Sequence, residues 1–317
     1  MSDPTPFSSL DLQAALLSNL ADIGYAEMTL VQAETLPHLL GGADVLARAK
    51  TGSGKTAAFG LGLLHRLDAS RFRSQALVLC PTRELADQVS KEIRRLARTI
   101  GNVKILTLCG GVPLGPQLAS LQHSPHVIVG TPGRVLKHLR QGTVALGELK
   151  TLVFDEADRM LDMGFADELN AILEFLPRDR QTLLFSATYP DSIAAISKRV
   201  QRDPVIVDVT DDEQPAHIEQ RWCSVTRENR NPELVRALRA WGGALNLVFC
   251  NTKVDCAEVA DYLNSEKIVA VALHGDLDQG ERNEVLVRFA NRSAVVLVAT
   301  DVAARGLDVK DLDAVFN

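Results

Sequence analysis

Two segments of the chain carry residues that together could handle a nucleoside triphosphate. Residues 47–56 read Ala-Arg-Ala-Lys-Thr-Gly-Ser-Gly-Lys-Thr, and residues 152–158 read Leu-Val-Phe-Asp-Glu-Ala-Asp. Gly52 and Gly54 allow a tight turn that points successive backbone N–H groups at phosphate oxygens. The first glycine of the general phosphate-loop pattern is replaced by Ala49, so the loop by itself is an incomplete match. The apolar strand that ends in acids supplies the second half of a nucleotide site.

Each side chain of these segments has a predicted role. Lys55 is expected to hold the β- and γ-phosphates, and Thr56 is expected to bind Mg²⁺. Asp155 would bind the same Mg²⁺ through water, while Glu156 would polarise the water that attacks the γ-phosphate. The predicted loop around ATP consists of Thr51, Gly52, Ser53, Gly54, Lys55 and Thr56. A glycine and serine turn beside surface acids is the alternative interpretation, which the strand-loop-helix context disfavours.

Composition sets the class of protein. The chain has 317 residues, a length that suffices for two domains of about 150 residues each. Of these residues 46% are hydrophobic and 23% charged, which is ordinary for a soluble protein. A net charge of −6 gives no overall basic field for nucleic acid. No apolar run reaches the ~18 residues of a membrane span, and Met1 to Leu10 lacks a signal-peptide pattern. We therefore expect a cytoplasmic protein without membrane contact, with its five cysteines reduced and mostly buried.

Short apolar runs alternate with amphipathic helical patterns, which predicts parallel sheets covered by helices on both faces. A polar stretch at residues 209–216 interrupts this rhythm and is predicted to link a domain of residues 1–208 to one of residues 217–317. Helices are expected, among other places, at 83–100, 167–175 and 253–264. Strands are expected at 45–46, 76–80, 104–108, 127–129, 152–154, 182–185, 205–209, 245–250, 269–273 and 295–299, with a further one opening at 313–317.

Further segments follow the predicted strands at the sheet edge where ligands collect. They are Pro-Thr-Arg-Glu-Leu-Ala at 81–86, Gly-Gly at 110–111, Thr-Pro-Gly-Arg at 131–134, Asp-Glu-Ala-Asp at 155–158, Ser-Ala-Thr at 186–188, and residues 248–252, 274–282 and 299–308. In order and spacing this set resembles the DEAD-box family of ATP-dependent RNA helicases. The resemblance covers essentially the whole chain, and several motifs in register make coincidence negligible.

The resemblance implies an α/β fold of two tandem RecA-like domains. The family's last motif, His-Arg-x-Gly-Arg-x-x-Arg, does not occur in the 317 residues, so we expect the second domain to be incomplete. We also expect an RNA-binding domain beyond that motif to be missing. The implied function is ATP hydrolysis that clamps and locally unwinds RNA duplexes, with ribosomal RNA as the expected substrate and a monomer as the expected state. The alternatives are a truncated ATP- and RNA-binding module with little turnover, and a DNA translocase.

An N-terminal segment resembles the family's base-reading motif, Gly-Phe-x-x-Pro-Thr-x-Ile-Gln. It reads Gly-Tyr-Ala-Glu-Met-Thr-Leu-Val-Gln at 24–32, with Phe7 upstream. The Gln32 amide offers one donor and one acceptor, which matches the N6 and N7 edge of adenine and not the O6 and N7 edge of guanine. We therefore expect Phe7, Tyr25 and Gln32 to contact the base and to favour ATP over GTP. Met28 stands where the family has proline.

The remaining site residues are carried over from the resemblance alone. Asp308 would meet the ATP ribose, and Ser186 and Thr188, through Asp158, would connect the nucleotide site to domain closure. Structural hydroxyls that cap the following turn are the alternative for Ser186 and Thr188, and helix caps and turns are the alternative for the predicted RNA residues of the first domain. The predicted RNA contacts are Thr82, Arg83, Gly111, Thr131, Gly133 and Arg134 in the first domain, and Gln279, Arg282 and Thr300 in the second.

Overall fold

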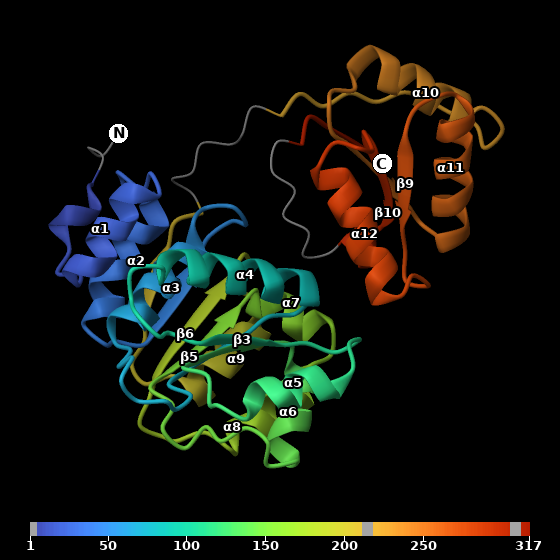
Figure 1. The fold of residues 1–317 in the computed structure, drawn as a ribbon. Coiled ribbons are helices and arrows are strands. Elements are labelled where there is room, and N and C mark those ends of the chain that lie inside the picture. Colours follow the sequence, from blue (N-terminus) through green and yellow to red (C-terminus); the bar gives the residue numbers. More distant parts are fainter. Residues whose placement is uncertain (1–4, 211–217, 305–311) are drawn as a thin grey trace. The chain divides into compact units, whose positions relative to one another are not determined.

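The structure, a computed structural model, describes residues 5–210, 218–304 and 312–317 (Figure 1). The chain divides into two compact units, Met1–Gln214 and Pro215–Asn317. The predicted domain limits, 1–208 and 217–317, stay a prediction, because most of the predicted linker between them lies outside the described residues.

The first unit contains a seven-stranded parallel sheet with the strand order β3-β4-β2-β5-β6-β1-β7. Its strands are β1 (Val45–Arg48), β2 (Ala76–Leu79), β3 (Ile105–Leu108), β4 (Val127–Gly130), β5 (Thr151–Asp155), β6 (Gln181–Ser186) and β7 (Val205–Asp208). Its helices are η1 (Phe7–Ser9), α1 (Ala14–Asp22), α2 (Leu30–Leu40), α3 (Lys55–His65), α4 (Arg83–Leu96), α5 (Leu114–Leu121), α6 (Pro132–Arg140), α7 (Ala157–Asp162), α8 (Ala166–Leu173) and α9 (Asp191–Val200).

Both faces of this sheet are buried. Along β2, Ala76 and Val78 join one apolar cluster, whereas Leu77 and Leu79 join a second cluster. Successive side chains of a strand point to opposite faces, so the two clusters are the two sides of the sheet. Helices α1 to α4 supply the first cluster, and α6 to α9 supply the second. Apolar runs without alternation, as in β2, β4 and β5, follow from this double burial.

The second unit contains a four-stranded parallel sheet with the order β11-β8-β10-β9. Its elements are α10 (Arg230–Trp241), β8 (Asn246–Cys250), α11 (Lys253–Ser265), β9 (Ala270–Leu273), α12 (Gln279–Ala290), β10 (Val296–Thr300), α13 (Asp301–Ala304) and β11 (Ala314–Phe316). Helices α10 and α11 pack on one face, and Phe289 of α12 packs on the other. The predicted class, α/β with parallel sheets covered by helices, is confirmed in both units.

One helix ends earlier than its pattern predicts. Helix α4 ends at Leu96 instead of residue 100. The Ile100 N–H bonds to the Ala97 carbonyl (2.9 Å) in a turn, and Asn102 then takes a left-handed backbone with φ of 62°. The chain must reverse there to enter β3, and this reversal overrides the amphipathic pattern of residues 97–100. Within the described residues no helix is both long and apolar enough to cross a bilayer.

Candidate nucleotide and RNA site

The predicted phosphate loop connects β1 to α3. Gly52 and Gly54 have φ of 84° and 99°, a left-handed backbone that side chains rarely adopt. Lys55 begins α3, and its Nζ donates to the Ala49 carbonyl (2.8 Å), so the lysine folds back across the loop. The Lys55 side chain is only 6% exposed. The positive N-terminal end of α3 and the lysine therefore lie at one place, as phosphate binding requires.

Asp155 is the last residue of β5 and is 3% exposed. Burial raises its pKa to about 7, while the nearby Lys55 charge opposes that rise. Thr56 and Asp155 supply the hydroxyl and carboxylate oxygens that Mg²⁺ prefers, and the poorly compensated buried carboxylate fits a cation. The described residues hold no group of three or more His, Cys, Asp or Glu that could bind a metal ion. Water and phosphate oxygens would have to complete the coordination of Mg²⁺.

Glu156 follows Asp155 with φ of 52°, which is left-handed for a non-glycine residue. Its Oε2 accepts a bond from the Arg159 guanidinium (3.1 Å), and its Oε1 accepts one from the Thr51 hydroxyl (3.5 Å). The carboxylate thus joins the phosphate loop to α7. The sequence interpretation assigned Arg159 no role, although an acid and an arginine three positions apart at the start of a helix is a recognisable signal.

Asp158 accepts three hydrogen bonds near the site. Its Oδ2 accepts bonds from the Thr188 backbone N (2.9 Å) and hydroxyl (2.7 Å), and its Oδ1 accepts one from the Arg159 N (3.0 Å). Burial would raise the pKa of Asp158, but these bonds outweigh burial and lower it. Ser186 is the buried last residue of β6. The structure therefore brings together Asp158 and Thr188, which the sequence predicted to act jointly with Ser186, whereas the buried Ser186 hydroxyl makes no hydrogen bond within the described part of the chain.

The Gln32 amide is 1% exposed and uses both of its ends within the protein. Its Oε1 accepts from the Thr29 N (2.9 Å), which completes a capping box at the start of α2. Its Nε2 donates to the Gly54 carbonyl (3.1 Å). A Cβ on Gly54 would lie 2.5 Å from this Nε2, so the loop needs glycine there. Gln32 is thus coupled to the phosphate loop, and its contact with adenine remains a prediction.

The two predicted aromatic contacts pack on each other. The Phe7 and Tyr25 rings meet edge to face, with centroids 6.0 Å apart, and Phe7 is 2% exposed. The Tyr25 hydroxyl donates to Glu92 (2.8 Å); burial and this carboxylate raise the pKa of Tyr25 to about 12. The Met28 N–H bonds to the Thr5 carbonyl (2.9 Å), a bond that proline could not make. In this structure Phe7 is a core residue, and its contact with the base remains a prediction.

Three predicted RNA residues of the first unit, Thr82, Gly111 and Thr131, lie in the loops that follow β2, β3 and β4, and a fourth, Arg83, begins α4. Thr82 caps α4 by accepting the Leu85 N–H (3.3 Å), and Thr131 precedes α6. Gly111 has φ of 74°, and a Cβ there would lie 1.6 Å from the Arg83 guanidinium. The glycine therefore leaves room for Arg83 to cover its loop.

Arg134, in the first turn of α6, is held in place by its neighbours. Its guanidinium donates to Gln117 Oε1 (2.8 Å) and to the Val112 carbonyl (2.9 Å). Burial, and then the charge of Arg83, lower the pKa of Arg134, so the two cations lie close enough to affect each other. A Cβ on Gly133 would meet nothing within 4 Å, so the backbone is open there. These residues share the sheet edge that holds the phosphate loop.

In the second unit two of the predicted RNA residues, Thr300 and Arg282, meet just after β10. The Thr300 hydroxyl accepts the Ala303 N–H (3.3 Å), and the Arg282 guanidinium donates to the Ala303 carbonyl (3.2 Å). Gln279 begins α12 and donates to Asn283 (3.1 Å). Asp308, predicted to meet the ribose, lies outside the described residues.

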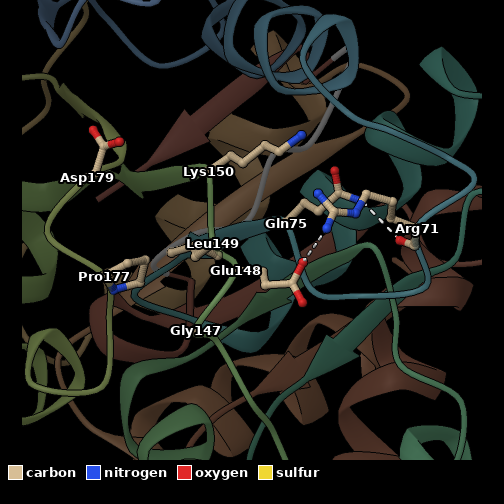
Figure 2. A pocket seen from close by; sticks show the side chains of 8 residues that line it. All are labelled: Arg71, Gln75, Gly147, Glu148, Leu149, Lys150, Pro177 and Asp179. Carbon is tan, nitrogen blue, oxygen red and sulfur yellow. Dashed lines mark hydrogen bonds and ion pairs between the residues drawn. The ribbon is translucent and has the colours of Figure 1, made fainter.

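A cavity of about 380 Å³, whose lining side chains are drawn in Figure 2, takes no part in this site. It lies at the amino ends of β2, β5 and β6, whereas the phosphate loop and the acids lie at the carboxyl ends. Arg71 crosses it to pair with Glu148 (3.4 Å). The cavity thus lies at the opposite edge of the first unit's sheet from the phosphate loop and the acids.

Comparison with known proteins settles the family. Residues 29–196 match the DEAD/DEAH box helicase family, and residues 231–317 match the Helicase conserved C-terminal domain. The chain belongs to the DEAD-box helicase family. It is 59% identical to the ATP-dependent RNA helicase DbpA of Escherichia coli K12 over 314 residues. This matched region covers 99% of this chain and 69% of the relative. It is 43% identical to the DEAD-box ATP-dependent RNA helicase CshA of Bacillus cereus, over 99% of this chain and 60% of the relative.

Solved structures of other helicases support the same family assignment. Dbp5 of S. cerevisiae, bound to RNA and ADP BeF3, is 29% identical with a TM-score of 0.87, covering 98% of this chain and 80% of that one. A DEAD box protein from Methanococcus jannaschii is 37% identical with a TM-score of 0.63, covering 98% and 84%. The predicted resemblance, the two RecA-like domains and the assignment as a helicase enzyme acting on RNA are therefore confirmed.

Proposed function

We propose that this protein hydrolyses ATP with Mg²⁺ and couples hydrolysis to the local separation of RNA duplexes. The observation that carries the proposal is the convergence of Lys55, Asp155 and Glu156 at one sheet edge, although they come from two distant segments. Gly54, Lys55 and the start of α3 offer hydrogen-bond donors to phosphate oxygens. Asp155 offers carboxylate oxygens to Mg²⁺.

In this proposal Lys55 exchanges its bond to the Ala49 carbonyl for a phosphate oxygen. When bound, Mg²⁺ would neutralise charge that develops between the β- and γ-phosphates. Glu156 would hold the attacking water, and the Thr51 and Arg159 bonds fix the position of its carboxylate beforehand. Positioning and electrostatics supply most of the catalysis in phosphoryl transfer, so a pre-oriented Glu156 suits this reaction.

The predicted RNA contacts fit a backbone-binding role. Arg83 and Arg134 are two cations beside the open Gly133 backbone, and the Thr82 and Thr131 hydroxyls lie on neighbouring loops of the same edge. Hydroxyls, guanidinium groups and backbone N–H groups are the usual partners of phosphate and sugar, and they carry no sequence information. These residues would therefore hold RNA without choosing it.

The choice of a particular RNA as the substrate is inferred from the relatives. The likeness to DbpA supports ribosomal RNA as the target, during assembly of the large subunit. We expect the protein to act as a monomer in the cytoplasm. The DNA-translocase alternative finds no support in the family assignment.

The proposal is tested by steady-state ATP hydrolysis and duplex separation with ribosomal RNA fragments, unrelated RNA duplexes and DNA duplexes. Hydrolysis stimulated by RNA and not by DNA, and most by ribosomal fragments, is the expected result. Nucleotide and RNA binding without turnover would favour the binding-module alternative, and equal stimulation by all duplexes would contradict the ribosomal assignment.

A matched pair of arginine variants tests the RNA surface. Arg134→Met should weaken RNA binding about tenfold or more, because a desolvated phosphate contact is lost. Arg140→Met removes an exposed arginine from the far end of the same helix and should leave RNA binding unchanged. Equal loss in both variants would mean that only the net charge matters.

A further inference from the structure

The one side chain that helix α5 buries is a glutamine. The structure describes every residue of this helix, and Gln117 is the single buried residue among them. The neighbouring Leu118 is exposed. Burying an amide is unfavourable unless hydrogen bonds inside the protein replace those that it makes with water. The contacts of Gln117 must therefore explain why a polar side chain occupies the position where an amphipathic helix would place an apolar one.

The Gln117 amide forms hydrogen bonds at both of its ends. Its Nε2 donates to the Cys109 carbonyl (3.0 Å), just beyond β3. Its Oε1 accepts from the Arg134 guanidinium (2.8 Å) and lies 2.9 Å from Nε2 of His138. Arginine can only donate hydrogen bonds, so the Gln117 atom beside Arg134 must be the oxygen. The amide thus joins the end of β3 to two residues of α6.

His138 donates to the same Gln117 oxygen from the second turn of α6. Burial, and then the charges of Arg134 and Lys137, lower the pKa of His138 and favour a neutral ring. A neutral imidazole carries one N–H, and this N–H is at Nε2 because the Gln117 Oε1 can only accept. The other nitrogen, Nδ1, faces the Thr143 hydroxyl (2.8 Å). The Gln117 oxygen therefore faces two donors, which fixes its position beside Arg134.

These contacts hold Arg134 in place and leave it able to bind a further group. The guanidinium also donates to the Val112 carbonyl (2.9 Å), in the loop that follows β3. The bonds to Gln117 and Val112 use two of the five N–H groups of an arginine, so it can still donate to a phosphate. A long side chain that is ordered before its ligand arrives loses less conformational entropy on binding, and the affinity rises accordingly.

We propose that Gln117 is a positioning residue for RNA binding, which acts by holding the Arg134 guanidinium ready for an RNA phosphate. The inference rests on the proposed role of Arg134 as an RNA contact. Gln117 itself does not touch RNA, because it is buried and both ends of its amide are used within the protein. His138 supports Gln117 from the side away from the loop.

The test measures RNA binding and RNA-stimulated ATP hydrolysis of Gln117→Leu. Leucine is close to glutamine in size but removes the acceptor for Arg134. RNA affinity should fall about fivefold, and the RNA concentration that gives half-maximal hydrolysis should rise by the same factor. ATP affinity and kcat at saturating RNA should not change, because the nucleotide residues are untouched. Gln122→Leu is the matched control: the same substitution at an exposed glutamine that follows α5 should leave RNA affinity unchanged.

A double-mutant cycle separates positioning from a general effect on the fold. If Gln117 acts through Arg134, then Gln117→Leu should change RNA affinity by less than about twofold when Arg134 is already methionine. A second variant covers a loss of stability, since Gln117→Leu leaves the buried His138 N–H without an acceptor. In Gln117→Leu combined with His138→Leu that donor is also removed, and RNA affinity should again fall about fivefold. Thermal unfolding by circular dichroism checks that each variant is folded.

The outcomes distinguish this inference from the proposed function. Equal losses of RNA affinity from Gln117→Leu with and without Arg134 would overturn the positioning role, as would parental RNA affinity in both Gln117 variants. If Arg134→Met binds RNA as the parent does, the RNA role of Arg134 is wrong and the positioning role fails with it. If Arg134→Met weakens binding and the Gln117 variants do not, the RNA contact stands and only the role of Gln117 is refuted.

Discussion

Replacing Asp155 by asparagine should stabilise the first unit, even though it removes a predicted catalytic group. Burial raises the pKa of Asp155 from 3.8 to about 7. A carboxyl with a raised folded pKa binds more protons in the folded than in the unfolded state between these values. Stability therefore falls as pH rises from about 4 to 7, and above 7 the full cost of burying the charge remains. A difference of about three pKa units corresponds to about 4 kcal/mol.

The amide introduced by Asp155→Asn cannot ionise and avoids that cost. Without nucleotide or metal, the first unit of the variant should exceed the parent in free energy of unfolding by about 4 kcal/mol at pH 8. At pH 5.5 Asp155 is already mostly protonated in the folded parent and ionised in the unfolded parent. The gain in free energy of unfolding should therefore shrink to about 2 kcal/mol. Glu156→Gln is the matched control. The buried Glu156 carboxylate already pairs with Arg159, so removing its charge should not stabilise the first unit.

The assay is hydrogen exchange by mass spectrometry at increasing urea, followed on peptides from β5 and β6. Both tryptophans, Trp222 and Trp241, lie in the second unit, so their fluorescence should show the same transition in parent and variant. If Asp155→Asn gives no gain at pH 8, or a gain that does not depend on pH, the buried charge is compensated and the reasoning is wrong.

Three other changes test the remaining groups. Glu156→Gln should bind ATP normally and lower turnover by about 10² to 10⁴, in nucleotide binding and steady-state assays; weaker binding would instead assign Glu156 to the metal. Thr188→Val removes one donor to the Asp158 anion and should destabilise the first unit by about 2 kcal/mol at pH 7 in urea unfolding, whereas Thr188→Ser should not. Because the pKa of Asp158 is lowered in the folded state, this loss should fade as pH falls below 3.8 and through the lowered pKa, and a constant loss would argue for packing alone. Gln32→Ala should reduce the preference for ATP over GTP in competition binding and weaken α2 by about 1 kcal/mol; an unchanged preference would limit Gln32 to its capping bonds.

The sequence determined the parts of this protein that depend on local spacing. Gly52, Gly54 and Lys55 define the phosphate loop because a left-handed turn and a following helix need those residue types in that order. Buried parallel strands read as short apolar runs, so nearly every strand could be located within one or two residues. Ordered motifs along the chain indicate the DEAD-box family by their residues and spacing alone.

The tertiary structure decided which of these residues meet. Asp158 and Thr188 are thirty positions apart and touch only because β5 and β6 are neighbours in the sheet. Gln32 bonds to Gly54 because α2 packs beside α3, and Phe7 is buried by Tyr25. Strand order and helix packing follow from the burial of both sheet faces together, a property of the whole unit that no local period encodes. The charge cost at Asp155 arises from the same burial, and no residue type by itself reveals it.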